Sequence, residues 1–384
     1  MRILFILLLF YHITNACTSI IISGRITKDG RPILWKQRDS NYENNSIVHF
    51  KGEKFYYIGI ANSYDTKDTA IWVGVNSEGF AIMNTASYNL VWDKENRKIE
   101  LDQEGILMKK VLGKCKNIKE FEQYLISTNG KRGVEANFGV IDAYGGAAYF
   151  EVSPDSFVKY DVNDLRIAPE GYLIRTNYSF YGDLNKGYGF IRYKNLQELV
   201  FLDKNRGELD EQAIILNYSR SLYNDIINKD GAYCRNRFLY FNDCIVRYTT
   251  VSSTIIKGAI SPEKSELTEL FVIPGWPLKA VVIPFRVKDV KYLGDFFINN
   301  DLKPSFINKK ALELKYKSVL FNKGSGKNYL DLNTIVGNGS LQKIIDFDRK
   351  TLVDYKNINF SDKKSIERFY TDLKNRIINF YKHL

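Results

Sequence analysis

The stretch that decides the fold is "CTSIIISGRITKDGRPILWKQRDS", which spans Cys17 to Ser40. Two apolar, β-branched runs at 17–22 and 32–35 are separated by "KDGR", whose Asp-Gly pair is a turn signal between strands. We therefore expect a hairpin in which Cys17 begins the first strand and the second strand returns "KQRD" beside it. An apolar leader directly precedes this stretch, so the cysteine stands where the leader is expected to be cut off.

The leader itself reads "MRILFILLLFYHITNA". Arg2 supplies a positive charge, Ile3 to Tyr11 is apolar, and Ala16 is a small residue before the expected cut. The apolar run is too short for a membrane anchor, which needs roughly 20 residues. We expect residues 1–16 to be a signal peptide and residues 17–384 to form the mature protein, secreted or periplasmic.

The composition is that of a globular protein with a large core. Hydrophobic residues make up 45% of the chain and aromatic residues 14%, which argues against disorder. The net charge is +11, but basic residues alternate with acidic ones and no nucleic-acid-binding motif is present. No segment after the leader is long and apolar enough to cross a bilayer. The sequence does not decide whether the protein is a homo-oligomer or whether Cys234 and Cys244 form a disulfide.

Histidine is nearly absent, which excludes several classes of enzyme. The chain has only His12, His49 and His383, of which the first lies in the leader and the last is the penultimate residue. A zinc hydrolase needs two or three histidines, and a serine or papain-like triad needs one well-placed imidazole. If the protein is an enzyme, its general base is not expected to be histidine.

The pattern along the chain predicts an α+β fold with antiparallel sheets in a single domain. Residues from about 288 onward are expected to form a C-terminal helical extension. Two further hairpins are predicted, Ala70–Val75 with Phe80–Asn84 and Asn137–Asp142 with Ala147–Val152. The predicted helices are Gly105–Ser127, Gly189–Leu202, Asp210–Ile227 and a last helix capped at Ser361-Asp362. The predicted later strands are Thr249–Gly258, Glu269–Gly275 and Leu278–Val287.

A cysteine at the N-terminus of a mature chain carries a thiol and a free α-amine on one residue. The amine titrates near ~7.7–8.0, so a neutral fraction can take the proton of the thiol. Cys17 is therefore able to attack an amide or ester carbonyl without histidine. Two alternatives remain: Cys17 is the lipidated residue of a lipoprotein, or it is an ordinary core residue. A lipoprotein signal usually has an aliphatic residue three positions before the cysteine, whereas this chain has Thr14 there.

This opening resembles the N-terminal-nucleophile (Ntn) cysteine hydrolases of the choloylglycine hydrolase, penicillin V acylase and isopenicillin N acyltransferase family. Its members open with Cys-Thr, here Cys17-Thr18, continue through an Asp-Gly turn, and present a basic residue, here Lys36, three positions before an aspartate, here Asp39. The resemblance continues to about Val287. It implies a four-layer αββα sandwich of two antiparallel sheets between helical layers, with neither a metal nor an organic cofactor.

The resemblance also suggests the roles of site residues. Asn84 in "FAIMNTASY" is placed at the oxyanion hole, Asn177 in "LIRTNYSF" is a second active-site asparagine, and Arg192 in "GFIRYKNLQEL" is a catalytic arginine on a helix. Asp39 is expected to hold Cys17 in place through its α-ammonium or thiol.

Lys36 stands where many relatives have arginine, and this departure puts its assignment in doubt. Lysine keeps the positive charge near the thiol but lacks the bidentate fork of arginine, which leaves Arg38 as an alternative for the active-site cation.

The function implied by the resemblance is cleavage of a linear, non-peptide C–N amide bond in a small N-acyl amide, through an acyl-enzyme on Cys17. Acyl transfer to an amine is a close variant. Exported cysteine dipeptidases share the same opening and are a second possibility within the superfamily. A non-enzymatic lipoprotein anchored through Cys17 is the alternative from a different class.

Overall fold

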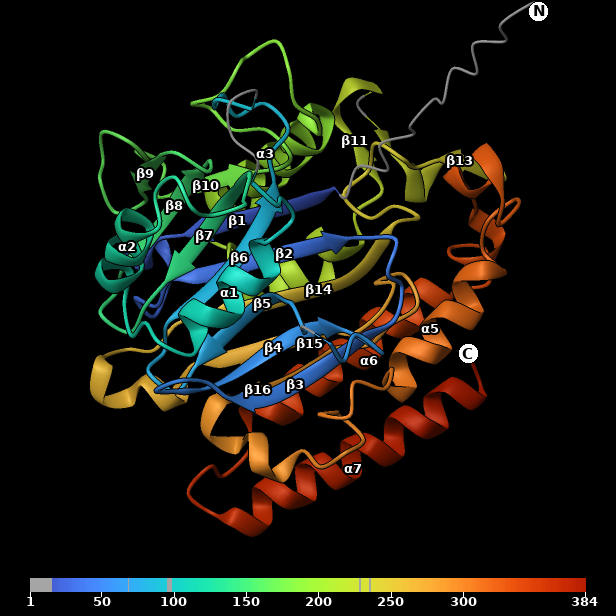
Figure 1. The fold of residues 1–384 in the computed structure, drawn as a ribbon. Helices are drawn as coiled ribbons and strands as arrows, with labels where there is room; N and C mark the ends of the chain where they lie inside the picture. The colour runs from blue at the N-terminus through green and yellow to red at the C-terminus, as the bar shows by residue number, and fades with distance from the viewer. Residues whose placement is uncertain (1–15, 68, 95–98, 228, 235) are drawn as a thin grey trace, which may run out of the picture.

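The structure is a computed structural model that describes residues 16–67, 69–94, 99–227, 229–234 and 236–384. The predicted leader, except for Ala16, lies outside the described residues. Two large antiparallel sheets pack face to face with helices on their outer sides (Figure 1). This confirms the predicted α+β class with its two sheets between helical layers.

The first large sheet has six strands in the order β10-β1-β2-β14-β15-β16. Its strands are β1 (Cys17–Ile22), β2 (Ile33–Asp39), β10 (Tyr172–Arg175), β14 (Thr250–Lys257), β15 (Glu269–Ile273) and β16 (Ile283–Arg286). The second has seven strands in chain order, β3 (Asn45–Lys51), β4 (Tyr56–Asn62), β5 (Ile71–Asn76), β6 (Ala81–Ala86), β7 (Ala136–Ile141), β8 (Ala147–Val152) and β9 (Phe157–Asp161). The two short pairs are β11 (Tyr223–Asn224) with β12 (Lys229–Asp230), and β13 (Phe238–Tyr240) with β17 (Tyr329–Asp331).

The helices lie on the outer faces of the two sheets. The seven-stranded sheet is covered by α1 (Glu104–Leu112) and α2 (Ile118–Ser127), whose apolar side chains share a core with β6, β7 and β8. The six-stranded sheet is covered by α3 (Phe190–Arg206), α4 (Glu211–Leu216) and α6 (Ser340–Lys356), with α7 (Lys363–Lys382) packed on α6. The remaining helix, α5 (Phe306–Tyr316), lies near the start of β3.

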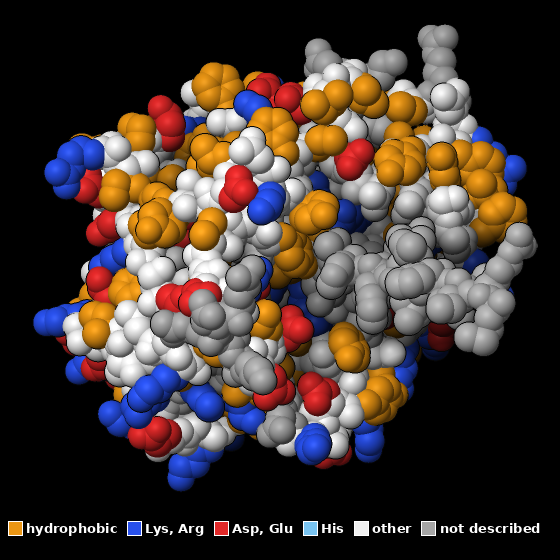
Figure 2. All heavy atoms as spheres, turned by 45° about the horizontal axis from the view of Figure 1, so that its top comes forward, with side chains coloured by type: hydrophobic (Ala, Val, Ile, Leu, Met, Phe, Trp, Pro, Cys, Tyr) orange, Lys and Arg blue, Asp and Glu red, His pale blue; other side chains and the backbone are white. Residues whose placement is uncertain are grey.

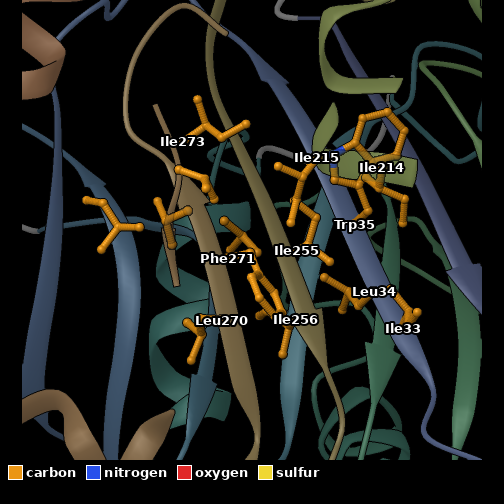
Figure 3. Close-up of a cluster of buried hydrophobic side chains, with 14 of the residues drawn as sticks. Ile33, Leu34, Trp35, Ile214, Ile215, Ile255, Ile256, Leu270, Phe271 and Ile273 are labelled. Atoms are coloured by element: carbon orange, nitrogen blue, oxygen red, sulfur yellow. The ribbon is translucent and has the colours of Figure 1, made fainter. Parts of the chain in front are cut away.

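Strand β2 is buried over its whole length because both of its faces are covered. Trp35 points toward the helical layer, where its Nε1 donates to Ser253 Oγ at 2.8 Å and its ring lies beside Ile214 and Ile215 (Figure 3). The neighbouring Lys36 points the other way, toward the seven-stranded sheet, where it contacts Trp72 on β5. Side chains of a strand alternate between its faces, so β2 supplies polar groups to both layers.

The three predicted hairpins are confirmed as β1–β2, β5–β6 and β7–β8. The predicted last helix is confirmed as α7, and Asp362 caps it by accepting from the backbone nitrogens of Lys364 and Ser365. Local turn and cap signals were sufficient at these positions because they need no distant partner.

Three predicted elements were wrong in extent, because tertiary contacts override local periodicity. The single helix Gly105–Ser127 is two helices, since Asn117 caps a new start by accepting from Glu120 N at 2.9 Å. The helix Asp210–Ile227 ends at Leu216, where the chain turns so that Arg220 reaches a buried partner. The strand Leu278–Val287 begins only at Ile283, because a turn precedes it in which Lys279 N bonds Trp276 O.

Two further observations concern the membrane and the thiols. Within the described part of the chain, no helix has the length and apolarity needed to cross a membrane. All four cysteines are free, so Cys234 and Cys244 do not form a disulfide in this structure.

The C-terminal helices are joined to the sheet by a buried ion pair. Asp348 on α6 is fully buried; one of its oxygens accepts from Arg220 and the other from Val282 N at 2.9 Å. Burial raises the pKa of Asp348 to about 6, although the neighbouring guanidinium opposes this change. The pair therefore fixes α6 relative to the strands beneath it.

Removing the carboxylate of Asp348 leaves Arg220 buried without its partner. We expect Asp348→Ala to lower the free energy of unfolding by about 3–5 kcal/mol, as measured by chemical denaturation. Asp346→Ala, at an exposed position on the same helix, is the matched control and is expected to change it by less than about 0.5 kcal/mol. Equal effects of the two variants would contradict the assigned role.

Candidate active site

Cys17 lies at the start of β1, buried, with Arg38 of β2 directly opposite in the sheet. Its backbone nitrogen donates to Asn177 Oδ1 at 2.9 Å. Its sulfur lies 4.0 Å from the backbone carbonyl oxygen of Asp39. In a chain cut before Cys17, the same nitrogen is the α-amine, so its hydrogen-bond acceptor is already in place.

Asn177 and Arg192 form one network around the start of β1. Arg192 donates through one guanidinium nitrogen to Asn177 Oδ1 at 2.9 Å, and through the other to the Cys17 carbonyl oxygen and to Thr18 Oγ1. Asn177 Nδ2 donates to Ala86 O at 2.8 Å, which fixes the orientation of its amide. Burial lowers the pKa of Arg192 to about 10, so the side chain stays cationic at neutral pH.

Gly189, the residue before α3, makes room for this network. Its φ is +88°, a left-handed conformation that favours glycine. A Cβ atom at this position would lie 2.3 Å from a guanidinium nitrogen of Arg192. The glycine is therefore required for the close approach of Arg192 to the backbone.

Lys36 and Asn84 lie together between the two sheets. Lys36 Nζ donates to Asn84 Oδ1 at 2.7 Å and to Trp72 O at 2.8 Å. An ammonium group can only donate, so the carbonyl oxygen of Asn84 must face Lys36 and its amide nitrogen must point away. No acceptor for that nitrogen lies within the described residues, and Asn84 lines the same cleft as Cys17.

Arg38 is held by neutral groups. Its guanidinium donates to Asn45 Oδ1, to Asn62 Oδ1 at 2.7 Å and to Ser40 Oγ, and it lies 4.9 Å from the centre of the Trp72 ring. Among the described residues, no carboxylate forms an ion pair with Lys36 or Arg38. Both cations belong to the site: Lys36 contacts Asn84, and Arg38 stands opposite Cys17.

The carboxylate of Asp39 is bound by Arg247 and Thr250 rather than by Cys17. It accepts from Arg247 Nε at 2.8 Å and from Thr250 Oγ1 at 2.6 Å. Its backbone carbonyl is the group near the Cys17 sulfur. Asp39 thus lies beside the nucleophile, but the expected contact of its carboxylate with the amine or the thiol of Cys17 is absent from the described structure.

The six residues predicted for the site, Cys17, Lys36, Asp39, Asn84, Asn177 and Arg192, all lie around the start of β1 and the adjoining end of β2. Their catalytic roles stay predictions. His49, which we interpret from the sequence as structural or exposed, is half-buried on β3, and its backbone nitrogen donates to Asn300 Oδ1.

Similarity to known proteins is confined to solved structures. No family model matches the chain, and no curated protein matches it. A Caenorhabditis elegans N-acylethanolamine-hydrolyzing acid amidase ortholog is 15% identical, with a TM-score of 0.41, covering 62% of this chain and 92% of that one. A variant of conjugated bile acid hydrolase from Clostridium perfringens is 12% identical, with a TM-score of 0.42, covering 71% of this chain and 93% of that one. Penicillin V acylase from Agrobacterium tumefaciens is 10% identical, with a TM-score of 0.37, covering 75% of this chain and 88% of that one.

These structural neighbours are Ntn hydrolases. They belong to the class that the opening of the sequence resembles. At these identities and TM-scores the likeness adds nothing to the geometry of the site.

A cleft of about 1360 Å³ opens beside Cys17. Most of the side chains around it are polar or charged. It is lined by Cys17, Lys36, Arg38, Asp39, Ser40, Asn41, Tyr42, Glu43, Asn44, Asn62, Ser63, Tyr64, Asp65, Trp72, Asn84, Ala86, Ser87, Tyr88, Lys94, Leu101, Asp102, Glu104, Glu135 and Tyr188. A pocket of this size holds a drug-sized ligand with room to spare.

One wall of the cleft is held by the C-terminal part of the chain. The carbonyl oxygen of Glu43 accepts from Asn308 Nδ2 at 3.0 Å, and its carboxylate accepts from Lys315 and Tyr316, all on α5. Asn45 N donates to Asn308 Oδ1 at 3.4 Å. The predicted C-terminal extension therefore supports the loop that follows β2.

Sequence reasoning missed Arg247, Thr250 and Glu104. A buried aspartate needs a cation, so Asp39 implied some basic partner, but nothing in the sequence chose Arg247 from the many arginines and lysines. Glu104 is the first residue of α1, and the helical pattern of this segment gave no indication that its side chain lines the site.

Lys36 is expected to give the site a pH dependence. Burial lowers the pKa of Lys36 to about 8, with the nearby Cys17 opposing the change, so the ammonium loses its charge as the pH rises through about 8. We expect the ratio of Cys17 alkylation rates by iodoacetate and iodoacetamide to fall severalfold over that range, because iodoacetate alone is attracted by the positive charge. The rates are read by mass spectrometry of the peptide that carries Cys17.

Lys36→Arg is the matched variant, because arginine stays charged throughout this range. Its ratio is expected to change much less with pH. A fall of the same size in Lys36→Arg, or no fall in the unmodified chain, would assign the dependence to another group.

Proposed function

We propose that the chain is an exported amide hydrolase whose nucleophile is Cys17, exposed as the N-terminal residue when residues 1–16 are removed. The observation that carries the proposal is the hydrogen bond from the Cys17 nitrogen to Asn177 Oδ1, beside a buried thiol that lines a large cleft. The substrate class is a small N-acyl amide with a linear, non-peptide C–N bond.

The first step uses the α-amine of Cys17 as the base. An amide oxygen only accepts, so Asn177 Oδ1 binds an N–H of the amine and leaves the nitrogen lone pair free for the thiol proton. The sulfur then forms a bond to the carbonyl carbon of the substrate, and negative charge moves to the carbonyl oxygen. In the uncut chain the nitrogen is part of an amide, which cannot act as this base.

Asn84 is placed to stabilise the charge on that oxygen. Its carbonyl is fixed by Lys36, and its amide nitrogen is directed away from Lys36 and is available to donate. Lys36 and Arg38 add positive charge and form no ion pair with a carboxylate of the described residues, which favours negative charge on the sulfur and the oxygen during the reaction.

The acyl-enzyme then forms and is hydrolysed. The C–N bond of the substrate breaks, and the ammonium of Cys17 returns its proton to the leaving nitrogen. Water next attacks the thioester, with the same amine taking its proton, and the carboxylic acid leaves with the thiol restored. An amine in place of water gives acyl transfer.

The lipoprotein alternative fits this geometry less well. A lipid group on the sulfur would have to fit at a position where Cys17 is only 6% exposed. Acylation of its nitrogen would also place a bulky group beside Asn177 and Arg192.

The experiment that tests the proposal compares a chain beginning at Cys17 with one that retains Ala16. We expect the first to hydrolyse members of an N-acyl amide panel and to gain the acyl mass in intact-protein mass spectrometry. Retaining Ala16 is expected to lower the rate by about 10²–10⁴-fold, because the base is lost while the thiol remains. Cys17→Ala is expected to form no acyl-enzyme.

The proposal fails if the chain beginning at Cys17 forms no acyl-enzyme with any member of the panel. It also fails if the protein from its own host carries a lipid on Cys17.

Asn84→Asp tests the oxyanion role, because it keeps an acceptor for Lys36 and removes the amide donor. We expect kcat to fall by about 10²–10³-fold while KM changes less. Asn41→Asp, at another asparagine that lines the cleft, is the control for the added charge. Similar losses in both variants would remove Asn84 from the mechanism.

A further inference from the structure

The acidic residues that line the cleft fall into two groups. Three carboxylates have cationic partners: Asp39 pairs with Arg247, Glu43 with Lys315, and Glu135 with Lys94 at 2.9 Å. The other three, Asp65, Asp102 and Glu104, form no ion pair within the described part of the chain. The cleft therefore holds carboxylates without an ion-pair partner among the described residues, in a protein with a net charge of +11.

Glu104 is the most unusual of these groups because it is buried. Only 7% of the residue is exposed, and the one hydrogen bond that it receives from another described residue is from Glu135 N to Oε1, at 3.0 Å. Its second oxygen accepts from no other described residue, and the side chain lines the cleft. Burial raises its pKa to about 7, so a cation placed beside it would restore the charged form.

Asp102 stands two positions before Glu104, and both residues line the cleft together with Tyr88. Asp102 is exposed and has a φ of +62°, a conformation that few residues other than glycine adopt and that asparagine and aspartate tolerate best. Burial raises the pKa of Tyr88, and the charges of Cys17, Glu104 and Asp102 add to this change. The phenol is thus kept neutral in the cleft that Glu104, Asp102 and Cys17 also line.

We propose that Asp102, Glu104 and Tyr88 form a subsite for a positively charged group of the substrate, an ammonium or a guanidinium. This inference rests on the proposed function, since it names the substrate class of the same cleft. Carboxylates next to an aromatic ring attract a cation both by charge and through the face of the ring.

The distribution of charged side chains on the surface does not by itself predict this subsite. On the face in Figure 2, acidic, basic and hydrophobic side chains are mixed over the upper half, and further basic side chains gather at the lower left. Lys36 and Arg38 lie next to the thiol and repel a cation, so attraction must come from the wall that contains Glu104. The substrate is thus an amide whose charged group lies away from the bond that is cleaved.

The test uses two thiol reagents of the same shape on the chain beginning at Cys17. The cationic one is 2-(trimethylammonium)ethyl methanethiosulfonate, and the neutral one is 3,3-dimethylbutyl methanethiosulfonate. In both, the Cys17 sulfur forms a disulfide with the reagent and methanesulfinate leaves. The rate constants are measured from the mass of the peptide that carries Cys17.

We expect the cationic reagent to react about 5-fold faster or more than the neutral one, and Asp102→Asn with Glu104→Gln to abolish this preference. Asp372→Asn, an exposed position on α7, is the control and is expected to leave the preference unchanged. Asp102→Asn alone, at an exposed position where asparagine tolerates the backbone conformation, is expected to reduce the preference without affecting folding.

Equal rates for the two reagents, or a preference that survives in the double variant, would overturn the subsite. A failure of the proposed function gives a different result. In that case Cys17 reacts slowly with both reagents and forms no acyl-enzyme, whereas a reactive Cys17 without charge preference removes only the subsite.

Discussion

The hydrogen bond from the Cys17 nitrogen to Asn177 Oδ1 is the contact on which the rest of the candidate site depends. It ties the first residue of β1 to the segment that follows β10, the strand beside it in the sheet. Arg192 donates to the same oxygen and to the Cys17 carbonyl, so the nitrogen, the thiol and the start of the strand are fixed together. A buried network of this kind rigidifies its members when all of them are satisfied.

Strand β2 separates two electrostatic environments. Lys36 and Arg38 point between the sheets, where their partners are neutral side chains and a backbone carbonyl. The carboxylate of the next residue, Asp39, pairs with Arg247 from the segment before β14. The alternation of side chains along one strand thus puts net positive charge on the side of the thiol and a neutralised pair on the other.

The hairpins and the last helix could be predicted because turn and cap signals are local. The turn signal "KDGR" was enough to predict that Cys17 lies beside Lys36, Arg38 and Asp39. Asn84, Asn177 and Arg192 were placed by resemblance, since spacing does not show that residues 160 positions apart in the sequence form a hydrogen bond. The direction of the Asp39 carboxylate and the burial of Glu104 depend on contacts between distant elements, which no local pattern contains.

The order of strands also has a consequence for how a synthesised chain acquires its thiol site. β1 and β2 emerge first and can pair at once, but the other neighbours of this pair in the sheet, β10 and β14, are made much later. Contacts between residues far apart in sequence form slowly because the loop between them must close. Until β10 docks, the nitrogen of Cys17 has no Asn177 to bind, and until β14 docks, Asp39 lacks Thr250. An unfinished chain thus carries an ordinary cysteine, and the assembled site is evidence that the whole sheet has folded.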